Sequence, residues 1–118
     1  MIMSYKDLDV YKVSYQCVIE VYKLTKSFPK EEMFALASQI KRASYSIPLN
    51  IAEGYGRKSS GKEFKRFLQM ALGSANEMQV ILELSKDLGY VSEDVFSSIS
   101  AEYVRVVKML RSLIQKTY

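Results

Sequence analysis

Apolar residues recur every three or four positions along most of the chain, which is the spacing of helices rather than of strands. Prolines and glycines mark the joints between the periodic stretches. The pattern predicts four helices: residues 7–27, residues 33–55, a segment from Ser60 to Gly89, and a segment that begins at Ser92. Short connections between them predict an all-α fold, an antiparallel up-down-up-down four-helix bundle, in a single domain of residues 1–118.

The first predicted helix carries two apolar stripes, although a helix on the outside of a monomeric bundle needs only one. One stripe is Leu8, Tyr11, Tyr15, Ile19 and Tyr22, and the other is Val10, Val13, Cys17, Val21, Leu24 and Phe28. Only one of them can face the bundle core. We therefore expect the second stripe to pack against a further partner, such as another subunit.

The run from Ser46 to Arg57 places a proline and two glycines in an otherwise helical pattern. Pro48 lies inside the second predicted helix, where it removes the backbone donor for the carbonyl of Ser44 and predicts a kink. Gly54 and Gly56 are expected to end this helix, because glycine readily adopts the left-handed conformation of a helix C-terminus.

The third and fourth predicted helices have clear starting signals. Ser60 and Glu63 fit a capping box, in which each side chain bonds the backbone N–H of the other residue. The small residues 73–75 predict close approach of a neighbouring helix. The fourth helix begins at Ser92, and its apolar positions predict a coiled-coil-like seam. That seam consists of Phe96, Ile99, Tyr103, Val106, Leu110 and Leu113.

Composition narrows the class of protein. The 118 residues are 48% hydrophobic and 25% charged, as in ordinary globular domains. The single cysteine, Cys17, excludes an intramolecular disulfide and fits a reducing cytoplasm. No signal peptide and no apolar run near the ~20 residues of a membrane span are present, so we expect a soluble, cytoplasmic protein. Without histidine, and with one cysteine, no usual zinc site can form in one chain, and we expect no cofactor.

Positive charge is concentrated between residues 41 and 66. This window holds seven cations and two acids, a formal balance of +5, whereas the whole chain carries +4. Such a concentration is typical of surfaces that bind RNA, DNA or another polyanion. The alternative is a solvated helix end with local ion pairs, for example between Glu53 and Arg57. The cations are Lys41, Arg42, Arg57, Lys58, Lys62, Lys65 and Arg66.

Asn50, Glu53 and Arg57 share one helix face at spacings of three and four. Such a set can form a site, or it can form a polar network that satisfies the backbone interrupted by Pro48. We favour a structural network of Asn50 and Glu53, because catalysis needs a tuned acid–base pair or a nucleophile. Among these residues only Glu53 could serve as a base.

Several stretches together resemble a known family. The chain is similar to the bacterial four-helix-bundle family of 23S rRNA-intervening sequence proteins. The resemblance implies an up-down-up-down bundle that assembles into homopentamers. It also implies kinship with accessory subunits of diversity-generating retroelements, which bind nucleic acid and a reverse transcriptase. The matching stretches are Tyr5-Lys6-Asp7-Leu8, Leu24-Thr25-Lys26-Ser27-Phe28-Pro29, Gln39-Ile40-Lys41-Arg42-Ala43, Ser46-Ile47-Pro48, Asn50-Ile51-Ala52-Glu53-Gly54, Glu63-Phe64, Phe67-Leu68, Ala71-Leu72-Gly73-Ser74 and Leu88-Gly89-Tyr90.

The leading hypothesis is a non-enzymatic, oligomeric bundle that binds nucleic acid, RNA or DNA, through its basic face. The alternative is a protein–protein assembly scaffold or adaptor with no nucleic-acid role, which the two-faced first helix favours. An enzyme is disfavoured, because the chain has no histidine, no metal-ligand cluster and no glycine-rich phosphate loop after a strand.

Overall fold

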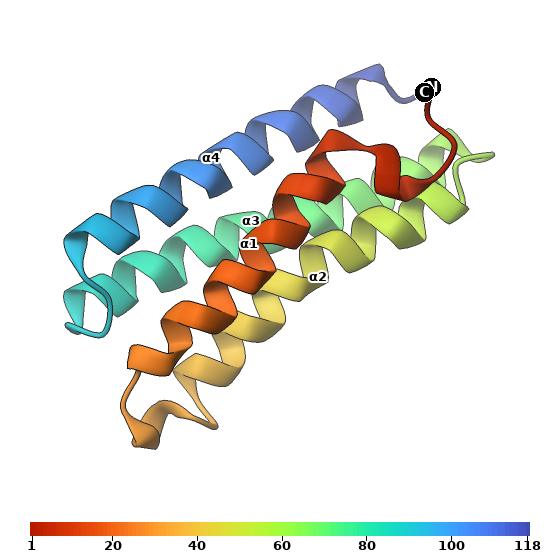
Figure 1. Ribbon diagram of the computed structural model, residues 1–118. Helices are drawn as coiled ribbons and strands as arrows, with labels where there is room; N and C mark the ends of the chain where they lie inside the picture. Colours follow the sequence, from red (N-terminus) through yellow and green to blue (C-terminus); the bar gives the residue numbers. More distant parts are fainter.

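The chain folds into four long helices joined by short connections, and the computed structural model describes residues 1–118 (Figure 1). The helices are α1 (Asp9–Leu24), α2 (Leu36–Gly56), α3 (Gly61–Asp87) and α4 (Glu93–Lys116). Short 3₁₀ helices precede and follow α1: η1 (Tyr5–Asp7), η2 (Thr25–Ser27) and η3 (Lys30–Glu32). Each long helix packs against the next one, and α1 also contacts α4. The predicted all-α, up-down four-helix bundle is confirmed.

One hydrophobic core extends between the four helices. Its fully buried members on α1 and α4 occupy positions of the apolar stripe and of the seam that helical spacing predicted: Val21, Tyr103, Val106 and Leu110. The fully buried members on α2 and α3 include Ile40, Ile47, Ile51, Leu68, Met78 and Leu82.

Helix α1 turns only one of its two apolar stripes toward this core. Cys17 and Val21 of one stripe are buried, whereas Tyr15, Ile19 and Tyr22 of the other stripe are 52%, 39% and 43% exposed. The second stripe therefore has no complete covering within the chain.

The connection between α1 and α2 is longer than the sequence predicted. The first predicted helix, residues 7–27, is an α-helix only to Leu24 and continues as the 3₁₀ helix η2. Phe28 then adopts an extended conformation, with φ −74° and ψ 146°, because the following Pro29 disfavours helical geometry at that residue. Helix α2 consequently begins at Leu36 rather than at residue 33.

Only half of the predicted capping box forms at the start of α3. The Ser60 hydroxyl accepts a hydrogen bond from the Glu63 N–H at 3.2 Å. The Glu63 carboxylate does not return to Ser60, because it accepts hydrogen bonds from Arg66 instead. The Ser60 N–H donates to the Arg57 carbonyl at 3.0 Å. Ser92 caps α4 as predicted, since its hydroxyl accepts from the Val95 N–H at 3.2 Å.

Gly54 serves packing rather than helix termination. Helix α2 runs through Gly54 and ends at Gly56, and neither glycine has a positive φ, so the predicted left-handed ending is wrong. A Cβ atom on Gly54 would lie 2.8 Å from the Cβ of Phe67 and 3.2 Å from the Phe64 ring. The missing side chain therefore lets α3 approach α2 closely.

Gly73 does not have the packing role that the sequence suggested. It is exposed, and a Cβ atom added there would meet nothing within 4 Å. Of the small residues 73–75, Ala75 is fully buried in the core, as is Ala71 one turn before it. The packing role expected of residues 73–75 is therefore found at Ala75, and the expectation is wrong at Gly73.

Candidate nucleic-acid interface

The seven predicted cations separate into two groups in space. Arg57 and Lys58 lie in the connection between α2 and α3, and Lys62, Lys65 and Arg66 lie in the first two turns of α3. We call these five residues the α2–α3 patch.

Lys41 and Arg42 lie near the opposite end of α2. At 1.5 Å per residue, Lys41 is about 24 Å along the helix from Arg57. The window of residues 41–66 therefore does not form a single surface.

The local fold assembles the α2–α3 patch from a short connection and a helix start. Residues 57–60 link the two helices, and the Ser60 cap fixes where α3 begins. A helix N-terminus presents free N–H groups and a partial positive charge, which adds to the charge of the nearby side chains. The fold thus places the basic side chains beside a helix end that itself attracts anions.

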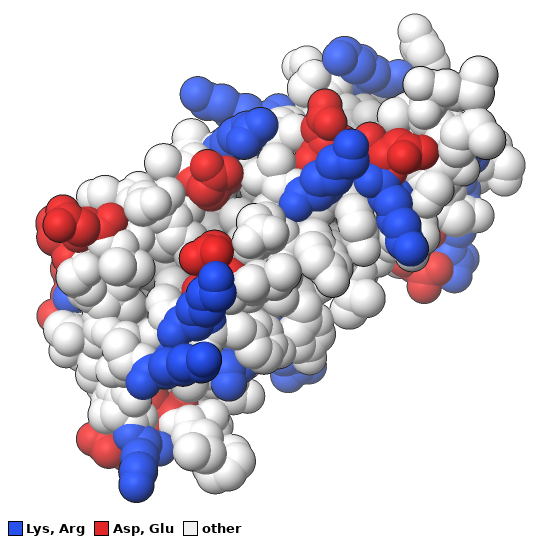
Figure 2. Space-filling model, viewed as in Figure 1, with Lys and Arg blue, Asp and Glu red and all other residues white.

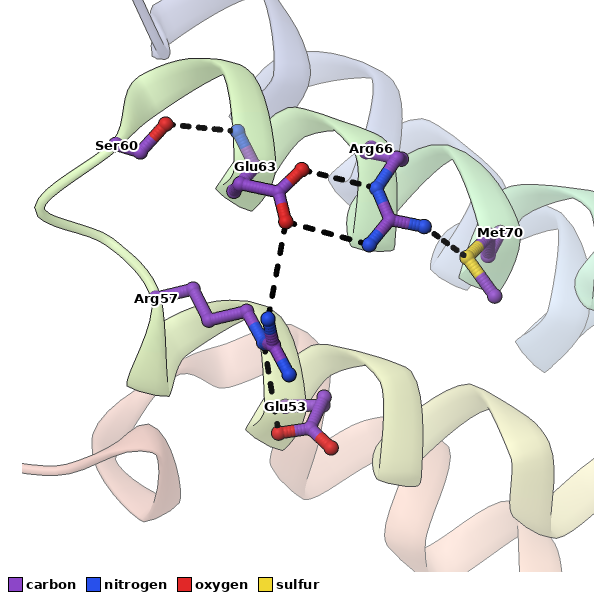
Figure 3. Close-up of polar contacts among 6 residues, drawn as sticks. All are labelled: Glu53, Arg57, Ser60, Glu63, Arg66 and Met70. Carbon is purple, nitrogen blue, oxygen red and sulfur yellow. Dashed lines mark hydrogen bonds and ion pairs between the residues drawn. The ribbon is translucent and has the colours of Figure 1, made fainter.

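Glu63 lies at the centre of the patch (Figure 3). Its carboxylate accepts hydrogen bonds from Arg66, with Nε–Oε2 at 3.0 Å and Nη2–Oε1 at 3.3 Å. Arg57 approaches the same carboxylate at 3.8 Å and pairs with Glu53 at 3.9 Å. The hydrogen bond from Arg66 lowers the pKa of Glu63, and the same bond raises the pKa of Arg66. The ion pair between Glu63 and Arg66 therefore remains charged at neutral pH.

Both arginines also lie over the ring of Phe67. The guanidinium carbon of Arg66 is 4.5 Å from the ring centroid, and that of Arg57 is 5.1 Å from it. A guanidinium held against an aromatic ring is stabilised by the ring's electron-rich face. The two arginines are thus positioned by Glu63 and Phe67 together.

The lysines of the patch have no carboxylate partners. The Lys58 amine donates to the Tyr55 hydroxyl at 2.7 Å and lies 3.9 Å from the centre of that ring, which leaves its charge uncompensated. No salt bridge involves Lys62 or Lys65, and Lys62 is exposed. Five cations against Glu53 and Glu63 give the patch a formal charge of +3. The local ion pairs of the alternative interpretation do form, but they leave three lysines available to an anionic ligand.

Asn50 and Glu53 have separate partners in the structure. The Asn50 amide donates to the carbonyl of Ser46 at 2.8 Å, two residues beyond the Ser44 carbonyl whose helical donor Pro48 removes. Glu53 is exposed and pairs with Arg57. The two residues therefore support the helix and the patch individually rather than as one hydrogen-bonded network.

A second basic surface was not predicted from the sequence. Lys23, Lys26 and Lys30 join Lys41 around a groove at the connection between α1 and α2. On the face drawn in Figure 2, basic side chains gather at the lower end, where Figure 1 shows the end of α1. The spacing of three between Lys23 and Lys26 was a signal, since it places these two on one side of a helix, whereas Lys30 lies beyond the break at Phe28.

Two further findings concern metal binding and membrane spans. No group of three or more His, Cys, Asp or Glu side chains is arranged to hold a metal ion. None of the four helices combines the length and the apolar character that a membrane span requires.

The fold and the patch define a four-helix-bundle protein with a basic surface at the joint between its second and third helices. Residues 6–112 match the 23S rRNA-intervening sequence protein family, and the chain belongs to that family. Among solved structures it is similar to a protein of unknown function from the S23 ribosomal protein family of Bacteroides thetaiotaomicron. The two are 30% identical with a TM-score of 0.81, over 90% of this chain and 95% of the other. A comparison with the curated proteins found no match.

Proposed function

We propose that this protein is a non-enzymatic, oligomeric helical bundle that binds RNA or DNA through the α2–α3 patch. The observation that carries the proposal is the group of three lysines without carboxylate partners, Lys58, Lys62 and Lys65, beside the N-terminus of α3. The single buried cysteine fits a reducing compartment, and we place the protein in the cytoplasm.

The proposed contacts are made to the phosphate backbone. A lysine amine is a compact point charge that binds phosphate without reading base identity. Tyr55 is engaged by Lys58 and packs edge-on against Phe64, with ring centroids 6.5 Å apart, so it is not free to stack on a base. Binding should therefore depend on salt and only weakly on sequence.

A non-enzymatic role is supported by the environment of the one carboxylate that could act as a base. The Glu53 side chain is 58% exposed and paired with Arg57. A general base is normally held in a pocket where its proton affinity is tuned by burial and neighbours. The setting of Glu53 suits an ion pair on a surface.

Assembly is supported by an apolar groove on the outside of α1 and α2. Tyr15 and Ile19 of α1 and Tyr45 and Leu49 of α2 line this groove, whose volume is about 310 Å³. Leu49 is 60% exposed and Tyr15 is 52% exposed. A second copy would cover these side chains and would add its own +3 patch to the assembly. The resemblance to the family suggests a pentamer.

The function is tested by measuring the binding of fluorescein-labelled 20-nucleotide RNA and DNA strands by fluorescence anisotropy. Charge reversal of Lys58, Lys62 and Lys65 to Glu should abolish binding to both strands at low salt. The matched control reverses three exposed cations of α4 that lie outside the patch, Arg105, Lys108 and Arg111. Equal binding by both variants, or no binding by the unaltered protein at low salt, would contradict the proposal.

The second candidate is an assembly scaffold without a nucleic-acid role, which the exposed stripe of α1 favours. Light scattering separates the assembly claim from the binding claim. Five copies of the 13.5 kDa chain give about 68 kDa. Leu49→Glu should reduce the mass toward that of one chain, whereas Val80→Glu, at a 69% exposed position of α3, should not. An oligomer that binds no nucleic acid would favour the scaffold, and a monomer would exclude it.

A further inference from the structure

We propose that the groove at the α1–α2 connection binds an acidic segment of a partner protein that carries apolar anchor residues. We call this surface the lysine groove. It is separate from the α2–α3 patch, since it lies at the other end of α2, and it has no part in the proposed nucleic-acid binding.

The lysine groove is built from three successive parts of the chain. The last turns of α1, the connection through Phe28 and Pro29, and the first turns of α2 enclose a volume of about 760 Å³. This is within the range of sites that hold ligands, roughly 300–1,000 Å³. Because Pro29 keeps the chain extended at Phe28, the connection leaves the helical path of α1 at this point.

Charge in the groove has one sign. Lys23, Lys26, Lys30 and Lys41 line it, and no acidic residue does. Only Lys23 has a salt-bridge partner, the exposed Glu20 at 3.5 Å. The Lys41 amine lies 5.1 Å from the centre of the Tyr22 ring, which holds the amine at the groove wall.

The acids nearest in sequence do not neutralise these lysines. Glu32 accepts a hydrogen bond from the Tyr90 hydroxyl at 2.7 Å and another from the Leu36 N–H at 3.3 Å. Neither Glu31 nor Glu32 lines the groove. An incoming acidic side chain would therefore meet cations that are largely free of competing carboxylates.

Apolar side chains form most of the remaining lining, and this favours a protein segment over a nucleic acid. Ile19, Phe28 and Met33 all line the groove. Aliphatic and thioether side chains gain stability by packing against other apolar side chains, which nucleic acid lacks. The aromatic face of Tyr22 is already occupied by Lys41, so it offers no platform for a base.

The rim extends the apolar surface beyond the groove. Met33 is 54% exposed and its neighbour Phe34 is 92% exposed, at the end of the connection between the two helices. Large apolar side chains left together on a surface mark interaction sites. Charge complementarity and this rim together point to an amphipathic helix with acidic and apolar faces, which is a recurring ligand of such grooves.

The test uses three labelled 16-residue peptides in anisotropy titrations with the full chain. The first places Leu and Phe at helical spacing on one face and Glu on the other. In the second, Ser replaces the apolar residues, and in the third, Lys replaces Glu. The first peptide should bind at least about tenfold more tightly than either of the others.

Variants then locate the binding site. Lys26→Glu with Lys30→Glu should weaken binding of the first peptide at least about tenfold, and so should Met33→Ser. Lys108→Glu with Lys116→Glu, the same charge change on α4, should have no effect. Lys26→Glu with Lys30→Glu should not change the binding of oligonucleotides through the α2–α3 patch. Each proposal can therefore fail without affecting the test of the other.

Four results would overturn the proposal. The first peptide could bind no more tightly than its serine counterpart, or with the same affinity to the Lys26→Glu, Lys30→Glu protein. An oligonucleotide could bind more tightly than the peptide and lose that binding in the same variant, which would make the lysine groove a nucleic-acid site. Self-association lost in that variant would show that a second copy occupies the groove.

Discussion

Two polar side-chain groups are buried in the core: the Cys17 thiol on α1 and the Tyr103 hydroxyl on α4. Cys17 is 3% exposed and Tyr103 is fully buried. Burial raises the pKa of the Cys17 thiol to about 12, and Glu102 and Glu20 contribute to the rise. Burial and the neighbouring Cys17 raise the pKa of Tyr103 as well. Both groups therefore stay neutral in the folded protein, and Cys17 is a packing residue rather than a reactive thiol.

The buried thiol makes stability depend on alkaline pH. An unfolded cysteine ionises near its ordinary pKa of 9.0, whereas the folded one keeps its proton to about 12. The neutral thiol therefore contributes fully below pH 9, and the free energy of unfolding should fall by about 1.4 kcal/mol per pH unit above it. Urea unfolding at pH 8, 9, 10 and 10.5 measures this loss. Cys17→Ala should make the decline shallower, and an identical decline in that variant would contradict the account.

The Tyr103 hydroxyl is buried with no hydrogen-bond partner, and this leads to a second prediction. Tyr103→Phe removes the unsatisfied group while keeping the ring, so the free energy of unfolding should rise by about 1 kcal/mol. Tyr90→Phe is the control, since the Tyr90 hydroxyl donates to Glu32 at 2.7 Å and its removal should cost about 1 kcal/mol. Urea unfolding of both variants decides the matter. A loss of stability in Tyr103→Phe equal to that in Tyr90→Phe would show that the hydroxyl has a partner.

At the scale of the helices, the α2–α3 contact depends on one position without a side chain. These two helices make the most extensive contact in the bundle, and they pack closely where Gly54 meets Phe67 and Phe64. The same contact positions Phe67 beneath Arg57 and Arg66. The geometry of the basic patch therefore rests on the packing of Gly54.

Alanine substitutions separate this packing role from helix propensity. Gly54→Ala should destabilise the protein by about 1–3 kcal/mol, because the added methyl group would overlap Phe67. Gly73→Ala, at an exposed position of α3, should stabilise it by roughly 0.5–1 kcal/mol, because alanine favours helix and meets nothing there. Thermal or urea unfolding compares the two. Stabilisation by both substitutions would show that α2 and α3 are not in close contact at Gly54.

Local signals in the sequence predicted the helices more accurately than they predicted the contacts between helices. Ser92 and Gly89 were identified correctly because a cap and a glycine with φ 81° act within one turn of the chain. The role of Gly54 was missed, since it depends on a phenylalanine thirteen residues away on another helix. The pairing of Glu63 with Arg66 was missed for a different reason. The capping box and the ion pair compete for one carboxylate, and spacing alone does not decide between them.

At the scale of the whole molecule, the excess positive charge forms two surfaces at opposite ends of α2. One is the α2–α3 patch, and the other is the lysine groove. Counting charge over residues 41–66 grouped Lys41 and Arg42 with the α2–α3 patch. A charge count along the sequence does not show that the 21-residue helix α2 separates these two residues from the patch. The three lysines of the connection region were missed because they precede that window. Only the folded arrangement shows which cations act together.

The salt dependence of nucleic-acid binding is the sharpest test of whether the α2–α3 patch contacts phosphates. On a single strand, each lysine that neutralises a phosphate adds roughly 0.7 to the magnitude of the slope of log affinity against log salt concentration. Binding of a labelled single strand should therefore weaken as salt is raised from about 50 to 200 mM. Lys62→Ala with Lys65→Ala should reduce the magnitude of the slope by roughly 1.4, and Lys108→Ala with Arg111→Ala should leave it unchanged. Affinity that does not respond to salt, or an equal slope in both variants, would contradict nucleic-acid binding by the α2–α3 patch.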